Sequence, residues 1–346
     1  MANEPTLRES IGIYSSGETA TMVHVVSTQD RGIEIIDRQE GELEQIAGYV
    51  HPFYRRVYQR IGRPKSTYND GPAELAVVHV MSGESLLART IKLPPVPSER
   101  MSEIVEFEAK QNIPFPMDEV SWGYRLNMGR EEYSALLVAT KKDTVEKQVM
   151  RLMGAGIKPT SIVTSFESIA RMVDKGVIIY PEGKSYTLVI VPGDGSFIPR
   201  TMPVSEPTRV WGEINRSFNV YRAQADNPKD ALDTLSTLFQ RELDPVLTQL
   251  LKEKAVVKEV RQITYDIFNG TSCPEYIALG AAIAGIKGDG IDLLKPRQKQ
   301  APADLDSAMK AELAFLQELH GMIIDRVNVL DTSNEVLTRL NGTAKP

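Results

Sequence analysis

Cysteine and histidine are scarce in this sequence of 346 residues. The single cysteine, Cys273, has no partner for an intrachain disulfide, and the four histidines, at positions 24, 51, 79 and 320, lie far apart. None of these residues has the spacing of a zinc site. We therefore expect a protein of a reducing compartment, without disulfides and without a bound metal ion.

Long runs of one kind of side chain are also missing. No run of Lys and Arg is of the kind that follows nucleic-acid phosphates, and the net charge is −6, so nucleic acid is not an expected partner. No apolar run reaches the length of about 18 residues that a membrane-spanning helix needs. The first ten residues, MANEPTLRES, lack the apolar core of a signal peptide. We expect no direct insertion into a membrane.

The composition is that of a folded globular protein, with 42% hydrophobic and 25% charged residues. At this length we expect two domains, or one large domain with insertions. Residues 9–27 predict a strand, a glycine-containing turn and a strand, and residues 32–40 predict another strand. A stretch with helical apolar spacing, interrupted or kinked by Pro52, and a strand at 74–82 follow. This order indicates an α/β layered domain.

A smaller unit of mixed helices and strands is predicted from about residue 91 to 163. It opens with an amphipathic helix at 97–112, which Pro114 ends because proline disfavours helix at the residue before it. We expect Phe115 and Trp122 to pack this unit onto its own sheet. The alternative is that they form one wall of a groove for a partner peptide.

The second half of the chain begins with a predicted β-ribbon at 177–204, which has turn signals at 181–183 and 193–195. The next segment predicts a helix whose apolar face is formed by Trp211, Ile214, Phe218 and Tyr221. We expect residues 226–262 to be mostly helical. The Ala- and Gly-rich segment at 274–288 predicts a helix whose small residues permit close packing.

The C-terminal tail carries a heptad pattern after a polar linker. Its helix either packs back on its own domain or joins a second copy or a partner, with a homodimer as one outcome. The positions of the predicted seam are Met309, Leu313, Leu316, His320, Ile323, Val327 and Leu330.

Three segments together resemble the PilM family. The first is QNIPFPMDEV at 111–120, the second is the stretch at 136–171, and the third pairs GEINRSFNVYRAQ at 212–224 with YIALGAAIAG at 276–285. The resemblance covers residues from about 10 to about 290, and its most specific parts are Ile-Pro-Phe-Pro and Ala-Gly-Ile-Lys-Pro.

The resemblance implies an α/β, actin-like two-domain fold of the FtsA/PilM type, with a small inserted αβ subdomain and a helical tail. The boundaries that it implies are 1–90 with 164–174 for the first actin-like subdomain, 91–163 for the inserted subdomain, 175–290 for the second actin-like domain, 291–300 for a linker or docking segment, and 301–346 for the tail.

The resemblance also implies a function. PilM proteins are cytoplasmic scaffolds at the inner face of the inner membrane, in type IV pilus and type II secretion-like platforms. They bind the cytoplasmic N-terminal segment of a PilN-type membrane protein and, through it, connect to PilO-type proteins. ATP is the family's ligand, held between the two large domains by two glycine hairpins.

The two hairpins depart from the pattern that the resemblance implies. The first, at 13–22, has no aspartate, and the second, at 181–187, has Pro181 where an aspartate is expected. The adenine loop expected between about 230 and 270 has no counterpart. We therefore expect a pseudo-ATPase with no cofactor, because phosphoryl transfer needs a carboxylate-held Mg²⁺. If Mg-ATP is retained, the residues that bind it are Ser15, Ser16, Gly17, Thr19, Gly183, Lys184 and Ser185.

Other functional classes stay open. An actin-fold ATPase that switches platform assembly, or a sugar-kinase-like phosphotransferase, is the enzyme alternative, and a filament-forming protein is the structural one. In the enzyme alternative, Asp194 is the carboxylate that replaces the missing hairpin aspartates. Otherwise Asp194 is an ordinary β-turn aspartate.

The segment GIDLLKPR at 290–297 resembles the Ile-Asn-Leu-Leu-Pro segment that opens PilN. It is either an extended exit from the last helix or an extended peptide that fills the PilN groove of its own or a neighbouring chain. The residues predicted for docking of a partner, or of the chain itself, are Ile113, Phe115, Trp122, Ile291, Leu293, Leu294 and Pro296.

Overall fold

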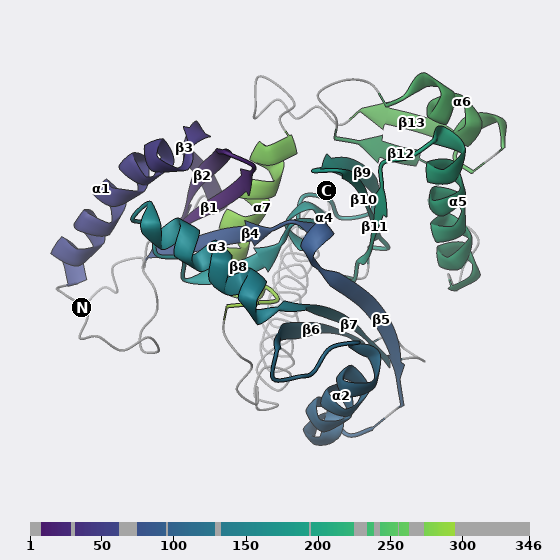
Figure 1. The fold of residues 1–346 in the computed structure, drawn as a ribbon, viewed down its shortest axis with the longest axis horizontal. Helices are drawn as coiled ribbons and strands as arrows, with labels where there is room; N and C mark the ends of the chain where they lie inside the picture. The colour runs from purple at the N-terminus through teal and green to yellow at the C-terminus, as the bar shows by residue number, and fades with distance from the viewer. Residues whose placement is uncertain are drawn as a thin grey trace, which may run out of the picture. The chain divides into compact units, whose positions relative to one another are not determined.

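The computed structural model describes residues 8–28, 32–61, 75–94, 96–128, 133–193, 195–224, 234–238, 243–254, 256–262 and 273–294. The chain divides into two compact units, of which one holds residues 1–95 and 107–297 and the other residues 96–106 and 298–346. The strands of the three β-sheets, which are labelled in Figure 1, belong to the first unit. The predictions for Asp194, Pro296 and the heptad seam of the tail fall outside the described residues.

The first sheet has the strand order β3-β2-β1-β4-β8. Its first three strands form an antiparallel meander, and β4 and β8 continue it in parallel. The register pairs Ile13 of β1 with Met22 of β2 and with His79 of β4. The strands are β1 (Arg8–Ser16), β2 (Thr19–Thr28), β3 (Gly32–Glu42), β4 (Leu75–Met81) and β8 (Ser161–Thr164).

The second sheet repeats this topology in the order β11-β10-β9-β12-β13. Strands β9, β10 and β11 form an antiparallel meander. Strand β9 also pairs in parallel with β12, and β12 pairs in parallel with β13. The strands are β9 (Gly176–Glu182), β10 (Ser185–Val191), β11 (Ile198–Pro203), β12 (Thr234–Thr237) and β13 (Glu259–Gln262). The chain therefore contains one sheet topology twice.

The third sheet is antiparallel, has the order β5-β7-β6, and lies in the sequence between β4 and β8. Its strands are β5 (Leu87–Leu93), β6 (Val120–Met128) and β7 (Tyr133–Lys141). We expected residues 161–163 to belong to this inserted unit, but they form part of β8 in the first sheet. Ile162 and Val163 are buried beside β4, and burial on both faces is typical of a parallel strand.

The helices are α1 (Leu43–Ile61), α2 (Ser98–Asn112), α3 (Lys142–Gly154), α4 (Ser165–Ala170), α5 (Pro207–Gln224), α6 (Pro245–Glu253) and α7 (Cys273–Lys287), with a short 3₁₀ helix η1 (Gly83–Ser85). α1 continues through Pro52. α4 begins where the Thr164 hydroxyl accepts a hydrogen bond from the Glu167 amide at 3.2 Å, a helix N-cap. None of the helices in the described ranges is long and apolar enough to span a membrane.

The segment 226–262 differs from its prediction. Instead of being mostly helical, its described part consists of β12, α6 and β13. Each strand has only four residues, which is too short for an alternating pattern to stand out in the sequence. Pairing with β9 and burial of Leu235 hold β12 in the second sheet.

Helix α7 packs on the first sheet. It contacts β1, β2, β4 and α4, although its residues were expected in the second actin-like domain. Small residues allow this close approach, as predicted. A Cβ on Gly12 of β1 would lie 1.9 Å from the Ala278 carbonyl oxygen, and one on Gly280 would lie 2.0 Å from the Ser168 carbonyl oxygen.

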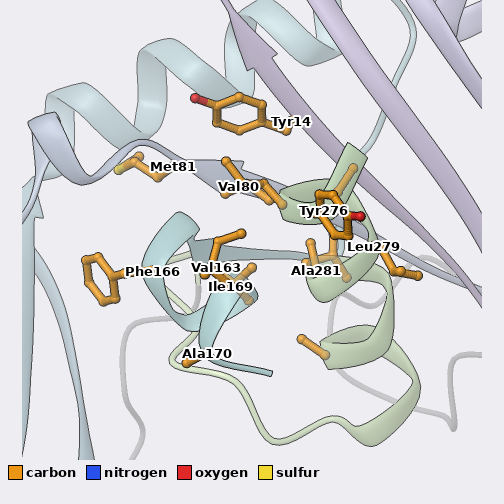
Figure 2. Close-up of a cluster of buried hydrophobic side chains, with 14 of the residues drawn as sticks. Tyr14, Val80, Met81, Val163, Phe166, Ile169, Ala170, Tyr276, Leu279 and Ala281 are labelled. Atoms are coloured by element: carbon orange, nitrogen blue, oxygen red, sulfur yellow. The ribbon is translucent and has the colours of Figure 1, made fainter. Parts of the chain in front are cut away.

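The largest hydrophobic core joins side chains from all three sheets with α4 and α7. In Figure 2, α4 and α7 lie side by side, with Ile169 on the side of α4 that faces α7. Tyr276 of α7 is fully buried there. A second core lies between the second sheet and α5, where Ile214, Phe218 and Tyr221 are buried as the spacing of the helix predicts. These cores fix the positions of the hairpins described below.

A pH prediction arises from His79, which is 1% exposed in β4. Burial, helped by the positive charge of Arg151, lowers its pKa to about 4. The unfolded chain binds a proton near pH 6.5 and the folded chain does not, so stability falls as the pH drops from about 6.5 to about 4. We expect the wild type to lose about 3 kcal/mol more than His79→Gln over this range, at roughly 1.4 kcal/mol per pKa unit. Urea unfolding of both proteins at several pH values measures this difference. If the free energies of unfolding of the two proteins change equally with pH, the prediction is contradicted.

Candidate functional site

The first predicted phosphate hairpin joins β1 to β2 through the turn Gly17-Glu18. Gly17 has φ +63°, a left-handed conformation that favours glycine. The Thr19 hydroxyl donates to the Ser16 carbonyl oxygen at 3.0 Å, and Arg151 of α3 donates to the Gly17 carbonyl oxygen. Residues 16–19 are exposed, so this turn presents a backbone carbonyl to an arginine.

The second predicted hairpin joins β9 to β10 through Gly183-Lys184. Gly183 has φ +59°, and a Cβ there would lie 2.3 Å from Oε2 of Glu84. The Lys184 amide donates to Oε1 of Glu84 at 2.6 Å. Glu84 belongs to η1, directly after β4 of the first sheet. The backbone N–H that would face a phosphate in such a hairpin therefore binds a carboxylate of the chain itself.

A second carboxylate lies at the base of the same hairpin. Glu182, the last residue of β9, is 1% exposed. Its Oε2 accepts hydrogen bonds from the Gly83 amide at 3.0 Å, the Ser165 hydroxyl at 3.0 Å and the Thr187 hydroxyl at 3.1 Å. Burial raises the pKa of Glu182, and these three donors oppose that rise because they favour the charged form. Glu182 thus joins β9 to η1 and α4.

Three groups near Glu182, two phenols and one thiol, have raised pKa values. Burial is the main cause that raises the pKa of Tyr14, Tyr180 and Cys273, and the charge of Glu182 raises them further. The Tyr180 hydroxyl donates to the Ser165 oxygen at 3.2 Å. The phenols and the thiol therefore stay protonated at neutral pH, and Cys273 is not a reactive thiolate.

The second hairpin differs from a phosphate-binding hairpin in its charged groups. A phosphate hairpin works through free N–H groups, a nearby cation and a carboxylate-held Mg²⁺. Here Glu84 occupies an N–H of the second hairpin, and Glu182 adds a buried carboxyl group behind it. Within the described ranges no group of three or more His, Cys, Asp or Glu side chains is placed to hold a metal ion. Neither Glu84 nor Glu182 was among the residues that the sequence indicated.

A prediction follows for Glu84. We expect Glu84→Ala to lower the free energy of unfolding by about 1 kcal/mol, because a charge-assisted hydrogen bond is lost at an exposed side chain. Glu18→Ala, in the exposed turn of the first hairpin, is the control and should change it by less than about 0.5 kcal/mol. Urea unfolding measures both. Equal changes in the two variants would contradict a role for Glu84 in closing the second hairpin.

The predicted docking segment follows α7, which ends at Lys287. The next residue, Gly288, has φ +67°, as is common after the end of a helix. Ile291 is 5% and Leu293 1% exposed, whereas the residue between them is only partly buried. The Leu293 amide donates to the Ile162 carbonyl oxygen of β8 at 2.8 Å, and the Ser121 hydroxyl of β6 donates to the Leu293 carbonyl oxygen. We call residues 289–294 the docked segment. It contacts β8 and β6, strands of two different sheets.

Charged side chains hold the start of the docked segment. Glu167 of α4 is fully buried, and its Oε2 accepts a hydrogen bond from the Ile291 amide at 3.0 Å. Its Oε1 lies 3.1 Å from both the Arg125 and the Arg171 guanidinium groups. Arg171 also pairs with Asp289 at 2.7 Å. Burial raises the pKa of Glu167, while the two arginines and the Ile291 amide oppose that rise and favour the carboxylate.

The other predicted docking residues fall in two places. Ile113 is buried, but Phe115 is 38% exposed, so the expectation that it packs in a core is wrong. Phe115 lines a hollow of about 410 Å³ together with Leu86, Leu87, Pro114 and other residues, and the Lys141 ammonium lies 5.4 Å from its ring centre. Trp122 is partly buried on β6 and stacks on Tyr124.

The duplicated sheet topology defines the class of the protein, which is actin-like, as predicted. A model of the family described as type IV pilus assembly protein PilM matches residues 32–190, which confirms the predicted resemblance to that family. A comparison with curated proteins gives no match.

Several solved structures are similar to this chain. A structure described as the PilM-PilN type IV pilus biogenesis complex is 17% identical, covers 80% of this chain and 98% of the other, and has a TM-score of 0.57. The cytoplasmic domain of EpsL, an inner membrane component of the type II secretion system of Vibrio cholerae, is 13% identical, with coverage of 83% and 98% and a TM-score of 0.47. A Bacteroides thetaiotaomicron protein with an actin-like ATPase fold is 9% identical, with coverage of 79% and 95% and a TM-score of 0.37.

Proposed function

We propose that this protein is a non-catalytic scaffold of a type IV pilus or type II secretion-like assembly platform. Its partner is the cytoplasmic N-terminal segment of a PilN-type membrane protein, through which it lies at the inner face of the inner membrane. The observation that carries the non-catalytic part is the hydrogen bond from the Lys184 amide to Glu84. The PilM family model and the similarity to a PilM-PilN complex support the partner.

The absence of ATP turnover follows from the charges at the second hairpin. A γ-phosphate there would have to displace the Glu84 carboxylate and approach Glu182, and like charges repel most strongly where burial excludes water. Pro181 stands where a metal-placing aspartate is expected, and it has neither a carboxylate nor an N–H group. The hairpin keeps the shape of a phosphate loop, and its hydrogen bond to Glu84 joins the first and second sheets.

The domain organisation that we propose follows the sheets. The two five-stranded sheets are the cores of the two actin-like domains, and the three-stranded sheet is the core of the inserted subdomain. α7 completes the first domain and not the second. The hydrogen bond from the Ser121 hydroxyl of β6 to the Leu293 carbonyl oxygen supports a position of the docked segment beside the inserted subdomain.

Binding of the partner is tested by fluorescence anisotropy. A labelled peptide that copies the cytoplasmic N-terminal segment of a PilN-type protein is titrated with the full-length chain, and a peptide of the same composition in scrambled order is the control. We expect saturable binding of the first peptide alone. Lack of saturation with folded protein, or equal binding of the scrambled peptide, would overturn the proposed partner.

The retained hairpin shape is the observation that favours the second candidate, an ATP-binding switch. Thermal melting with and without Mg-ATP separates it from the scaffold. A ligand at about 100 times its Kd stabilises a folded protein by about 2.7 kcal/mol. The scaffold predicts no shift in melting temperature, and a shift with Mg-ATP would favour the switch.

A further inference from the structure

The docked segment lies on two sheet edges. β8 is the last strand in the order of the first sheet, and β6 is the last strand in the order of the third. Edge strands present backbone groups that can pair with an added strand. The segment bonds to both backbone groups of Ile162 in β8, and the Ile162 carbonyl oxygen accepts from the Leu293 amide at 2.8 Å. We call the space between β6 and β8 that holds it the edge groove.

The edge groove recognises the backbone of the docked segment through side chains. The buried Glu167 accepts from the Ile291 amide, and the Ser121 hydroxyl donates to the Leu293 carbonyl oxygen. The Asp292 side chain bonds to both the groove and the segment. Its Oδ1 accepts from the Ile162 amide at 3.0 Å and from the Leu294 amide at 2.9 Å. Donors and acceptors aimed at the backbone of an extended chain are the features by which proteins bind peptides of defined sequence.

The side chains of Ile291 and Leu293, which alternate along the segment, are both buried in the largest core cluster. Gly123 of β6 forms part of the Ile291 pocket, since a Cβ at that position would lie 2.7 Å from the Ile291 Cγ2 atom. A side chain at position 123 would fill the space that the isoleucine uses. The groove therefore accepts a branched apolar residue, then a residue with a carboxylate or amide oxygen, then leucine.

We propose that the edge groove is a peptide-binding site and that residues 289–294 are its intramolecular occupant. A partner segment of the same chemistry binds there by displacing them. The identity of that partner as a PilN-type segment rests on the proposed function, whereas the intramolecular occupation does not. The docked segment then controls access to the groove.

The docked segment and a free peptide compete for the groove, and this competition sets how much the segment weakens binding of the peptide. An occupant on the same chain has an effective concentration in roughly the millimolar range when its connection is short. The apparent Kd of a free peptide rises in inverse proportion to the fraction of open groove, so a groove that is closed about 99% of the time weakens binding about 100-fold.

The test uses a fluorescein-labelled peptide that copies residues 288–297, GDGIDLLKPR. It is titrated with full-length wild type, with the double variant Ile291→Ser/Leu293→Ser, and with Val220→Ser/Val246→Ser as the matched control at exposed positions. We expect the peptide to bind the Ile291→Ser/Leu293→Ser variant at least about tenfold more tightly than the wild type or the control. Equal binding to all three, or no binding to a folded variant, would overturn the proposal.

Hydrogen exchange of the wild type keeps the proposal testable if the double variant does not fold. With excess peptide, exchange at the amides of Ile291, Leu293 and Leu294 should rise while that of β6 and β8 stays protected. Continued protection of the three amides at the same peptide concentration would overturn the proposal.

A PilN-type peptide titrated with the same proteins separates the two proposals. If it binds no variant while the 288–297 peptide binds the double variant, the proposed partner fails and the intramolecular occupation stands. If it binds the wild type and the double variant equally, the partner stands and the occupation of the groove fails.

Discussion

The Glu167→Ala variant is expected to unfold with a free energy about 3 kcal/mol below that of the wild type, because removing one partner of a buried ion pair leaves a buried charge uncompensated. The Arg171 side chain is only 7% exposed, and the Ile291 amide also loses its acceptor. The expected loss stays at the lower end for a buried pair, since Asp289 still faces Arg171 at 2.7 Å.

The control for this variant is Glu213→Ala, which removes an exposed pair with Arg216 on α5. It should lower the free energy of unfolding by less than about 1 kcal/mol, the usual range for a surface ion pair. Urea unfolding at pH 7 measures both variants. If Glu167→Ala loses no more than Glu213→Ala, the cluster around Glu167 does not hold α4 and the docked segment together.

The second large effect is expected at Gly280. Alanine there places its Cβ 2.0 Å from the Ser168 carbonyl oxygen, a backbone atom that cannot rotate away, so α7 must move off α4. Overpacking of this kind costs about 2 to 3 kcal/mol. We expect a loss of that size, or a failure to fold.

Gly212→Ala is the matched control, because its Cβ meets nothing within 4 Å on helix α5. This variant should gain about 0.5 to 1 kcal/mol, since alanine has the higher helix propensity. Changes of opposite sign in thermal or urea unfolding support the close approach of α4 and α7. Changes of the same sign would contradict it.

The parts of the fold that could be predicted are those with a local pattern. Alternation around a turn glycine predicted β1 and β2, and the two turns at 181–183 and 193–195 predicted β9, β10 and β11. Helical spacing predicted the buried face of α5, and the small residues of α7 predicted its close packing. Each of these features depends only on residues that are close together in the sequence.

The parts that could not be predicted depend on distant segments. β12 has four residues and becomes a strand because it pairs with β9. α7 packs on the first sheet, which is built mostly from the N-terminal quarter of the sequence. Periodicity shows that a helix has an apolar face but not which sheet covers it.

The acidic residues of the candidate site were missed for the same reason. Glu84 and Lys184 are 100 residues apart, and Glu167 and Ile291 are 124 apart, so nothing in the local sequence joins them. In the sequence Glu182 resembles an ordinary turn residue, because it directly precedes Gly183. The one sequence feature that sets it apart is that the apolar run at 177–180 ends two residues before it.

Isothermal titration of the full-length protein with a PilN-type N-terminal peptide, with and without Mg-ATP, tests the proposed scaffold most directly. The proposed scaffold predicts the same Kd under both conditions, because the Glu84 carboxylate accepts a hydrogen bond from the Lys184 amide of the second hairpin. Binding that appears only with Mg-ATP, or no binding under either condition, would contradict a nucleotide-independent scaffold.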